Sequence, residues 1–439
     1  MSSVQDSTPP PPRPCDVLII GGGPAGSCAA TLLAQRGWQV VMLEKARHPR
    51  FHIGESLLPL NIPILERMGA LDKVRAIGLP KYGADFPAED GSFNVFDFRC
   101  TLRAAPDYAF QVKREEFDQV LFEHARAAGV DARDGVRVER VEFDPTGRPC
   151  VHAGSERWQP RHLIDASGRD AFLGRALGLK RRNRRHASAA VFSHYRGVAR
   201  RSGRDAGNVS IYRHADGWAW AIPLRDGSTS VGVVCFPEHL KARQGDLEDF
   251  LRQTLATIPE LAHRMRQSER VAPVHVTGNY AYECTRMHGR HWTLIGDAYA
   301  FVDPMFSSGV FLAMHAAEQA AAMVDATLRE PAREGALQRA LQRRIDAGLA
   351  EFKWFIYRFT SPTMQSLFAH PRDVLGVEKA VVSMLAGDVF DARPVLRRLR
   401  VFRLIYAINA LAMAPSAWRA WRRRRRQLAV DMREETLHE

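Results

Sequence analysis

The fold class of the chain is indicated by residues 16–44, which read DVLIIGGGPAGSCAATLLAQRGWQVVMLE. The apolar run at residues 17–20 is typical of a parallel strand that is buried on both faces. A glycine-rich turn and an alanine-rich segment follow, and Gly37 marks a helix end before a second apolar run at residues 40–43. The order of strand, glycine turn, helix and strand predicts a complete βαβ unit.

The turn of this unit matches the dinucleotide-binding pattern GxGxxG through Gly21, Gly23 and Gly26. Glycines at these positions permit a tight turn and let backbone N–H groups approach a pyrophosphate at the N-terminus of the helix. Glu44 ends the next strand, where a carboxylate accepts hydrogen bonds from an adenosine ribose. The pattern predicts dinucleotide binding without separating FAD from NAD, and the alternative is a glycine turn that holds no ligand.

The composition is that of a globular protein, with 439 residues, 46% hydrophobic and 25% charged. This length predicts two coupled domains. The formal net charge of +13 fits an acidic partner, which could be nucleic acid, anionic lipid, an acidic carrier protein or a phosphate-rich cofactor. The six cysteines are scattered without a CxxC pair, which favours reduced thiols, a cytoplasmic location and no metal site.

The pattern along the chain suggests five regions. We expect a helix at residues 110–130, strands at 136–143 and 158–165 beside it, and mainly strands from 185 to 280. Residues 1–14 have no apolar core segment, so we expect no signal peptide there, and no apolar run is long enough to predict a membrane-spanning helix. The expected regions are a disordered tail (1–14), an FAD-binding domain (15–184 and 286–334), an inserted β-sheet substrate domain (185–285) and a helical C-terminal region with a basic tail (335–439).

A second motif separates FAD from NAD. An apolar strand at residues 293–295 leads into Gly296 and Asp297, followed by Pro304 and a helix that starts near Ser308. An acid at that position can bind a ribitol hydroxyl, and the helix N-terminus would face the pyrimidine end of a flavin. This segment, together with the N-terminal GxGxxG, resembles the FAD-dependent aromatic hydroxylase and halogenase superfamily. The resemblance assigns Arg114 to the cofactor and Pro304 to the same site, whereas an exposed helix-cap charge is the alternative for Arg114.

Four further segments resemble the flavin-dependent halogenases of that superfamily. They are residues 49–59 (PRFHIGESLLP), 79–86 (LPKYGADF), 217–223 (GWAWAIP) and 301–309 (FVDPMFSSG). The segment at 217–223 alone could be two core tryptophans on one strand face, but all four occur in the family's order. The resemblance implies an α/β glutathione-reductase-type FAD-binding Rossmann fold with an inserted β-sheet substrate domain and a helical C-terminal part.

The resemblance also implies roles for individual residues. Lys81 matches the lysine that holds or directs hypohalous acid beside the substrate, although an ordinary solvated lysine is the alternative. Trp218 and Trp220 match the tryptophans that keep the substrate away from the flavin. Backbone N–H groups of Ser308 and Gly309 match a halide site, which suits an anion at a helix N-terminus. Phe301 and Phe306 are expected along the path to the substrate.

One departure from the family narrows the expected substrate. Tryptophan halogenases carry a glutamate where this chain has Phe306. The pattern resembles the members that act on phenols and pyrroles, which are often tethered to an acyl carrier protein. We therefore expect an electron-rich phenol, a pyrrole or an aryl polyene precursor of secondary metabolism rather than free tryptophan.

The expected cofactor is FAD, with O2 and chloride or bromide as co-substrates. No second GxGxxG for a nicotinamide cofactor occurs in the sequence, so a separate reductase is expected to supply reduced FAD. One rival function is a single-component aromatic hydroxylase that reduces its own FAD with NAD(P)H. The other is a non-catalytic flavoprotein built around the basic segment at residues 400–428, which could dock a carrier protein, contact an anionic membrane or remain solvated. Nucleic-acid binding is not expected, because the sequence contains no motif that would contact nucleotide bases.

Overall fold

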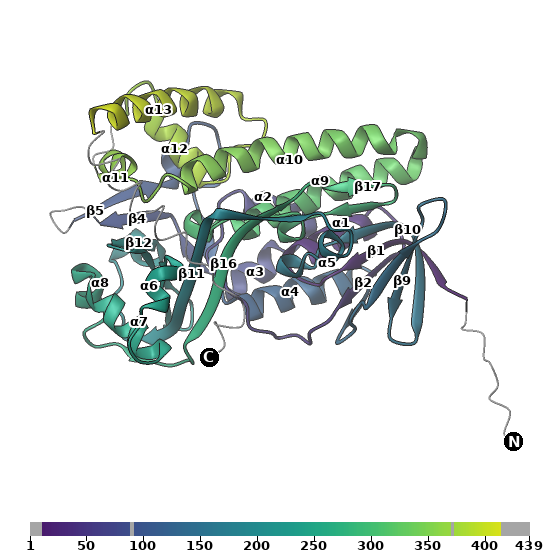
Figure 1. Cartoon of the computed structure of the whole chain (residues 1–439), viewed down its shortest axis with the longest axis horizontal. Coiled ribbons are helices and arrows are strands. Elements are labelled where there is room, and N and C mark those ends of the chain that lie inside the picture. Colours follow the sequence, from purple (N-terminus) through teal and green to yellow (C-terminus); the bar gives the residue numbers. More distant parts are fainter. Residues whose placement is uncertain (1–10, 88–91, 370–372, 414–439) are drawn as a thin grey trace, which may run out of the picture.

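The computed structural model describes residues 11–87, 92–369 and 373–413, without the side chains at 184–187, 279–280, 304 and 369. Figure 1 shows an elongated molecule in which one sheet lies toward each end and long helices run along one side. Within the described residues, no helix is both long enough and apolar enough to cross a membrane. The basic residues 422–426 lie outside the described part of the chain, so the expectations for that tail stay predictions.

The first sheet is built on the βαβ unit that the sequence predicts. β1 (Arg13–Ile20) lies between β2 (Val40–Glu44) and β10 (Glu156–Asp165) and pairs with both in parallel. The outer parallel strands are β7 (Asp131–Asp134) and β18 (Trp292–Leu294), and short antiparallel strands extend the sheet: β8 (Arg140–Phe143), β9 (Pro149–Ala153) and β17 (His288–Gly289). β1 begins inside the expected tail of residues 1–14.

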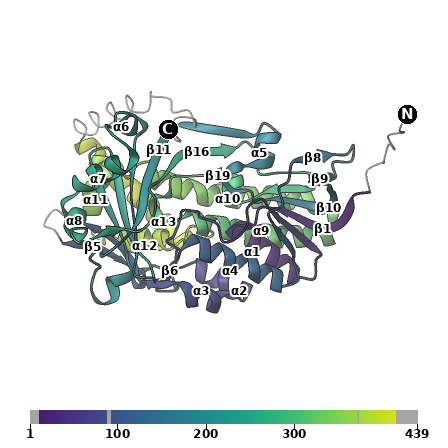
Figure 2. The same ribbon diagram turned by 90° about the horizontal axis from the view of Figure 1, so that it is seen from below.

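A layer of helices covers one face of this sheet. α1 (Pro24–Ala34) packs between α4 (Arg114–Ala127) and α9 (Gly309–Arg329), and Figure 2 shows α1 and α4 beneath the strands.

The expected strand at 136–143 is only partly correct, because β8 starts at Arg140. The preceding residues line a cavity instead of joining a strand ladder, and the Val136 N–H donates to the Glu44 carbonyl at 2.8 Å.

The second sheet has nine strands among the described residues. Its long strands β11 (Lys180–Arg196) and β16 (His275–Cys284) pair side by side and run toward the first sheet (Figure 1). The others are β4 (Gly83–Pro87), β5 (Phe93–Asp97), β12 (Val209–His214), β13 (Gly217–Pro223), β14 (Thr229–Cys235), β15 (Glu269–Arg270) and β19 (Ala300–Phe301). β4 pairs in parallel with β12 and antiparallel with β5, so these two strands join the second sheet, although their positions in the sequence lie within the expected FAD-binding domain.

Three helices that the sequence analysis did not predict cover the outer face of the second sheet. They are α6 (Pro237–Lys241), α7 (Leu247–Ala256) and α8 (Pro259–Arg264). Phe250, Leu251 and Leu261 on these helices form a separate apolar core with alternate residues of the central strands, including Val231 and Val233. The opposite face of the sheet is therefore free to line a cavity. The boundaries of the domains stay a prediction.

The C-terminal region is helical, as expected, in its described part. Its helices are α10 (Glu334–Ile356), α11 (Pro362–Ala369), α12 (Val377–Leu385) and α13 (Arg393–Ala412). α12 packs between α13 and a short turn at Phe98–Cys100, and Figure 1 shows α11–α13 above the end of the second sheet. This region closes the molecule above strands β4 and β5.

A short antiparallel pair lies between the two sheets. β3 (Leu79–Lys81) pairs with β6 (Ala109–Gln111), with Lys81 opposite Ala109. The other edge of β6 meets the loop at residues 53–57, where Ser56 forms an isolated bridge with Gln111. This arrangement brings residues 56 and 81 to one place.

The glycine turn permits an unusually close approach of α1 to β1. Gly21 has a φ of +103°, and a Cβ on Gly26 would lie 1.9 Å from the Gly21 carbonyl oxygen. Both atoms belong to the backbone, so neither can move away without shifting the strand or the helix. The turn therefore requires glycine at residue 26.

We predict that Gly26→Ala lowers the free energy of unfolding by about 3 kcal/mol, because the new methyl group overpacks a backbone contact. Gly335→Ala in α10 is the matched control. A Cβ there would lie 3.2 Å from the Arg339 guanidinium, the far end of a flexible side chain. Urea denaturation should show a large loss for the first variant and little change for the second. Equal stability of both variants would contradict the assigned packing.

Candidate active site

A cavity of about 770 Å³ lies between the two sheets. Its walls come from the carboxyl ends of β1 and β2, the loop at residues 50–56, the start of α9 and the inner face of the second sheet. The predicted site residues that line it are Gly21, Gly23, Glu44, Arg114, Trp218, Trp220, Asp297, Phe301 and Gly309. The fold thus brings together residues that are far apart in the sequence, and Gly26 supports them from behind.

The end of the cavity beside the glycine turn suits a dinucleotide. The Glu44 carboxylate is buried and accepts hydrogen bonds from the Gly22 N–H at 2.8 Å and the Ala46 N–H at 2.9 Å. Arg50 lies next to Gly23, where its Nη2 would be 3.4 Å from an added Cβ. A guanidinium beside glycine N–H groups provides the charge that a pyrophosphate needs.

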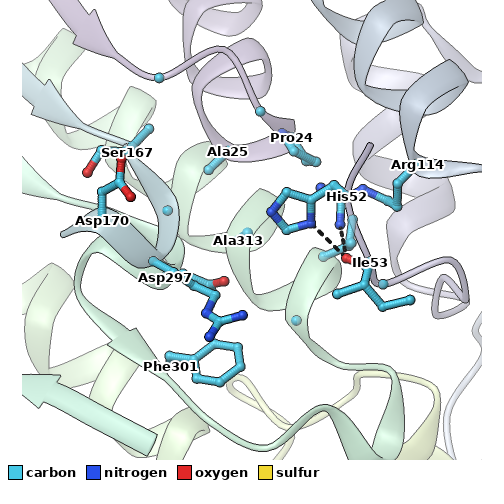
Figure 3. Close-up of a pocket in the computed structure, with 18 of the residues that line it drawn as sticks. Pro24, Ala25, His52, Ile53, Arg114, Ser167, Asp170, Asp297, Phe301 and Ala313 are labelled. Atoms are coloured by element: carbon cyan, nitrogen blue, oxygen red, sulfur yellow. Dashed lines mark hydrogen bonds between the residues drawn. The ribbon is translucent and has the colours of Figure 1, made fainter. Parts of the chain in front are cut away.

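Arg114 secures the wall of the cavity opposite Asp297 (Figure 3). Its side chain is 6% exposed, donates to both Asp118 carboxylate oxygens at 2.8 and 3.0 Å, and donates to the Ile53 carbonyl at 2.8 Å. The alternative of an exposed helix-cap charge is therefore wrong. Burial raises the pKa of Asp118, but the charge and hydrogen bonds of Arg114 outweigh it and hold that pKa below its usual value.

Asp297 faces the cavity from the short turn at Gly296–Ala298 (Figure 3). Burial raises the pKa of its carboxyl to about 6, although the charges of Arg169, Arg114 and Lys180 act in the opposite direction. Phe301 lies beside it, with the Arg169 guanidinium 5.1 Å from the ring centroid. A carboxyl group exposed to the cavity and short of hydrogen-bond donors fits a ligand that brings hydroxyl groups.

The N-terminus of α9 opens onto the same cavity. Gly309 and Val310 in its first turn line the wall, and no side chain caps this end. Ser308 is fully buried, and its hydroxyl has no hydrogen-bond partner among the described residues. Uncapped N–H groups and the positive end of the helix dipole suit a small anion. The side chain of Pro304 lies outside the described residues, so its role stays a prediction.

Lys81 lies in a second, much smaller cavity of about 20 Å³. It is 1% exposed, and burial lowers the pKa of its amine to about 7. Its Nζ donates to the Ser56 hydroxyl at 2.7 Å and lies 5.5 Å from the centroid of the Phe98 ring. The alternative of a solvated lysine is therefore wrong. Phe306 also lines this cavity.

The two cavities share part of their walls. Residues that line both are Val209, Ile211, Met305 and Ser307. Ser56 lines the large cavity while its hydroxyl holds the amine that lines the small one. Lys81 thus lies one layer of side chains away from the large cavity.

The two predicted tryptophans lie on one face of β13. Trp218 and Trp220 are each 5% exposed, and their ring centroids are 5.8 Å apart. The Trp220 indole N–H donates to the Ser230 hydroxyl at 3.2 Å. Both rings line the large cavity, so they are core residues and cavity residues at once.

Several residues of the site are not among those that the sequence predicts. The cavity is also lined by Arg50, Glu55 and Ser56, and the half-buried His194 supports it through a 2.8 Å contact of its Nε2 with the Glu55 carboxylate. Arg50, Glu55 and Ser56 all lie within residues 49–59, one of the four segments that resemble the halogenases. The resemblance of that segment is the feature of the sequence that could have indicated them.

We predict that Asp297→Asn stabilises the FAD-free protein at pH 8 by about 2 kcal/mol, because a buried carboxylate is replaced by a neutral amide. The folded-state pKa lies above the unfolded value, so the carboxylate destabilises the folded state at high pH. The gain should shrink to about half at pH 5 and to about a fifth at pH 4. Urea denaturation at these pH values measures it.

Asp226→Asn is the control, because it should change the free energy of unfolding at pH 8 in the opposite direction. Burial raises the pKa of Asp226, but hydrogen bonds from Lys113 and Ser228 outweigh it and lower the pKa to about 2. This variant should be less stable than the wild type at pH 8. A gain for both variants, or for neither, would contradict the assigned environment of Asp297.

Comparisons with known proteins agree with this geometry. Residues 14–351 match the family model of the FAD binding domain. The chain is 34% identical to a tryptophan 2-halogenase of Chondromyces crocatus over 72% of this chain and 62% of that protein. It is 30% identical to a 1H-pyrrole-2-carbonyl-[peptidyl-carrier protein] chlorinase of Pseudomonas fluorescens over 86% of this chain and 90% of that protein.

Solved structures show the same fold. A flavoprotein/dehydrogenase from Cytophaga hutchinsonii superposes with a TM-score of 0.82 at 27% identity, over 91% of this chain and 100% of that one. The flavin-dependent halogenase CmlS superposes with a TM-score of 0.76 at 28% identity, over 89% of this chain and 77% of that one. The expected FAD-binding fold, the FAD cofactor and the enzyme class are confirmed, and the chain belongs to the flavin-dependent halogenases.

Proposed function

We propose that this enzyme halogenates an electron-rich ring, a phenol, a pyrrole or an aryl polyene precursor, with chloride or bromide, O2 and reduced FAD. The observation that carries the proposal is the amine of Lys81, which is buried in a small aromatic cavity one side-chain layer from the large one. An enzyme that transferred oxygen directly from the flavin would have no use for an amine at that position.

The large cavity fits FAD. The glycine turn, Glu44 and Arg50 suit the adenosine and pyrophosphate, and Asp297 suits the ribitol hydroxyls. FAD, when bound and reduced, supplies the chemistry that uses O2 to oxidise halide. The start of α9 holds the halide with backbone N–H groups, and Trp218 and Trp220 fill the space in which a ring could otherwise approach the flavin.

Lys81 then receives hypohalous acid, which is small enough to pass between the two cavities. A neutral amine accepts a hydrogen bond from this acid through its lone pair, whereas an ammonium has no lone pair and cannot accept one. The ring gains a carbon–halogen bond, and the proton it loses leaves with the hydroxide of hypohalous acid as water. Lys81 holds the oxidant at the carbon to be halogenated, so halogenation is directed rather than random.

The lining of the small cavity favours an activated ring. Its described lining residues include Phe86, Phe98 and Phe306, and no carboxylate is among them. A phenol or pyrrole is nucleophilic enough to react without a second acid. The cavity is smaller than a ring, so a substrate enters only when a lining side chain moves.

A carrier-tethered substrate and a separate reductase complete the proposal. One relative is named for a pyrrole on a peptidyl carrier protein and another for tryptophan. The net charge of +13 suits an acidic carrier, and Phe306 in place of a glutamate favours the pyrrole or phenol. Reduced FAD comes from a partner reductase, since the sequence holds one GxGxxG. A cytoplasmic location remains a prediction.

We predict that Lys81→Met abolishes ring halogenation, by at least about 100-fold, because the side chain keeps its volume and loses the amine. The assay contains a flavin reductase, NADH, FAD, O2, bromide and phloroglucinol as a probe ring, with excess free methionine to consume hypobromous acid that leaves the enzyme. Binding of FAD should be unchanged. Normal brominated product from this variant would refute the role of Lys81, and hydroxylated product from the wild type would favour the aromatic hydroxylase.

We further predict that ring bromination in the wild type rises as the pH increases through about 7, because the pKa of Lys81 lies there and the neutral amine is the reactive form. The measurement is brominated product per turnover from pH 5.5 to 8.5, with reduced FAD supplied in excess at every pH. A yield independent of pH over this range would contradict the use of a neutral amine.

A further inference from the structure

We propose that Ser56 is the positioning residue of Lys81, and that its hydroxyl keeps the amine aimed into the small cavity whether or not the amine is protonated. This inference rests on the proposed function, because it assumes that the amine of Lys81 takes part in halogenation. It concerns the wall between the two cavities, where the two side chains meet.

The contact is short and isolated. The Lys81 Nζ lies 2.7 Å from the Ser56 Oγ, and among the described residues this is its one hydrogen bond. Ser56 is 3% exposed and Lys81 is 1% exposed, so water does not compete freely for either group. A long, flexible side chain with a single polar anchor depends on that anchor for its direction.

The backbone fixes both partners against the same strand. β6 pairs with β3 on one edge, with Lys81 opposite Ala109. On the other edge, the Val112 N–H donates to the Glu55 carbonyl at 2.8 Å, and the Leu57 N–H donates to the Phe110 carbonyl at 2.9 Å. Because Ser56 lies between these two hydrogen bonds, its hydroxyl is placed by the backbone rather than by side-chain packing.

The ionisable groups around this contact are paired with one another. Burial alone accounts for the lowered pKa of Lys81. Glu55, on the same loop as Ser56, binds His194 of β11 at 2.8 Å. Asp85 of β4 lies 3.3 Å from Arg201 and accepts a hydrogen bond from Asn208 at 3.0 Å. The serine is therefore the group that acts on the amine directly.

A hydroxyl suits this task because it both donates and accepts hydrogen bonds. It accepts from an ammonium and donates to the lone pair of a neutral amine, so it holds Nζ in either state. Alanine would leave the buried ammonium without a partner and would lower the pKa of Lys81 further. Threonine would keep the hydroxyl.

The test compares Ser56→Ala and Ser56→Thr in the FAD-loaded protein. The pKa of Lys81 is measured from its 13Cε chemical shift in lysine-labelled protein, with Lys81→Met for assignment. Bromination of phloroglucinol is measured with excess free methionine, which consumes hypobromous acid that leaves the enzyme. Oxidation of a freely diffusing bromination trap is measured in a separate assay without phloroglucinol or methionine, and both are expressed per bound FAD. Ser193→Ala is the matched control, because Ser193 is fully buried in β11 and donates to the Ala272 and Pro273 carbonyls.

For Ser56→Ala we expect the pKa of Lys81 to fall by about one unit and ring bromination to fall at least about tenfold, with trap oxidation unchanged. Ser56→Thr and Ser193→Ala should keep all three values near those of the wild type. Unchanged ring bromination in Ser56→Ala, or an equal loss in Ser193→Ala, would overturn the proposal. Absence of bromide-dependent trap oxidation in the wild type would instead refute the proposed function, while the pKa comparison would still test the contact.

Discussion

The backbone pairing around β6 is the constraint on which the rest of the site depends. One edge of this short strand holds β3 with Lys81, and the other holds the loop with Ser56. Backbone hydrogen bonds buried in this way are costly to break, so the two side chains keep their separation. The same loop carries Ile53, whose carbonyl binds Arg114, and thus links the lysine to the wall of the large cavity.

The site places ionisable side chains in enclosed positions where apolar side chains would make the folded state more stable. Asp297 and Lys81 are both enclosed, and burial moves their pKa values toward the neutral forms. Burying either charged group lowers the stability of the FAD-free protein. Ionisable groups with shifted pKa values cluster at sites that bind ligands or react. Glu44 differs, because both of its oxygens accept backbone hydrogen bonds and so hold the glycine turn before any ligand arrives.

Local patterns in the sequence predicted the strands and helix at the start of the first sheet. They did not predict which strands pair when these lie far apart in the sequence. The βαβ unit was evident because apolar periodicity and the glycine spacing are local properties. The parallel pairing of β4 with β12 joins residues 84 and 209, which no local pattern connects. Residues 136–139 have the composition of a strand, yet they line the cavity, because tertiary contacts override propensity.

The burial of Lys81 and Arg114 could not be read from composition, because charged side chains are mostly exposed. Resemblance to a family indicated their roles, and the structure showed the partners Ser56, Asp118 and Ile53.

The proposed function requires that halide is oxidised in the large cavity and used at Lys81 in the small one. The most direct measurement reduces the FAD-loaded protein, admits O2 with or without bromide, and quantifies oxidised bromine with a diffusing trap and no ring present. We expect trap oxidation that requires bromide and persists in Lys81→Met. Peroxide alone, with rapid direct reduction of the flavin by NADPH, would contradict this expectation and would place the enzyme among the hydroxylases.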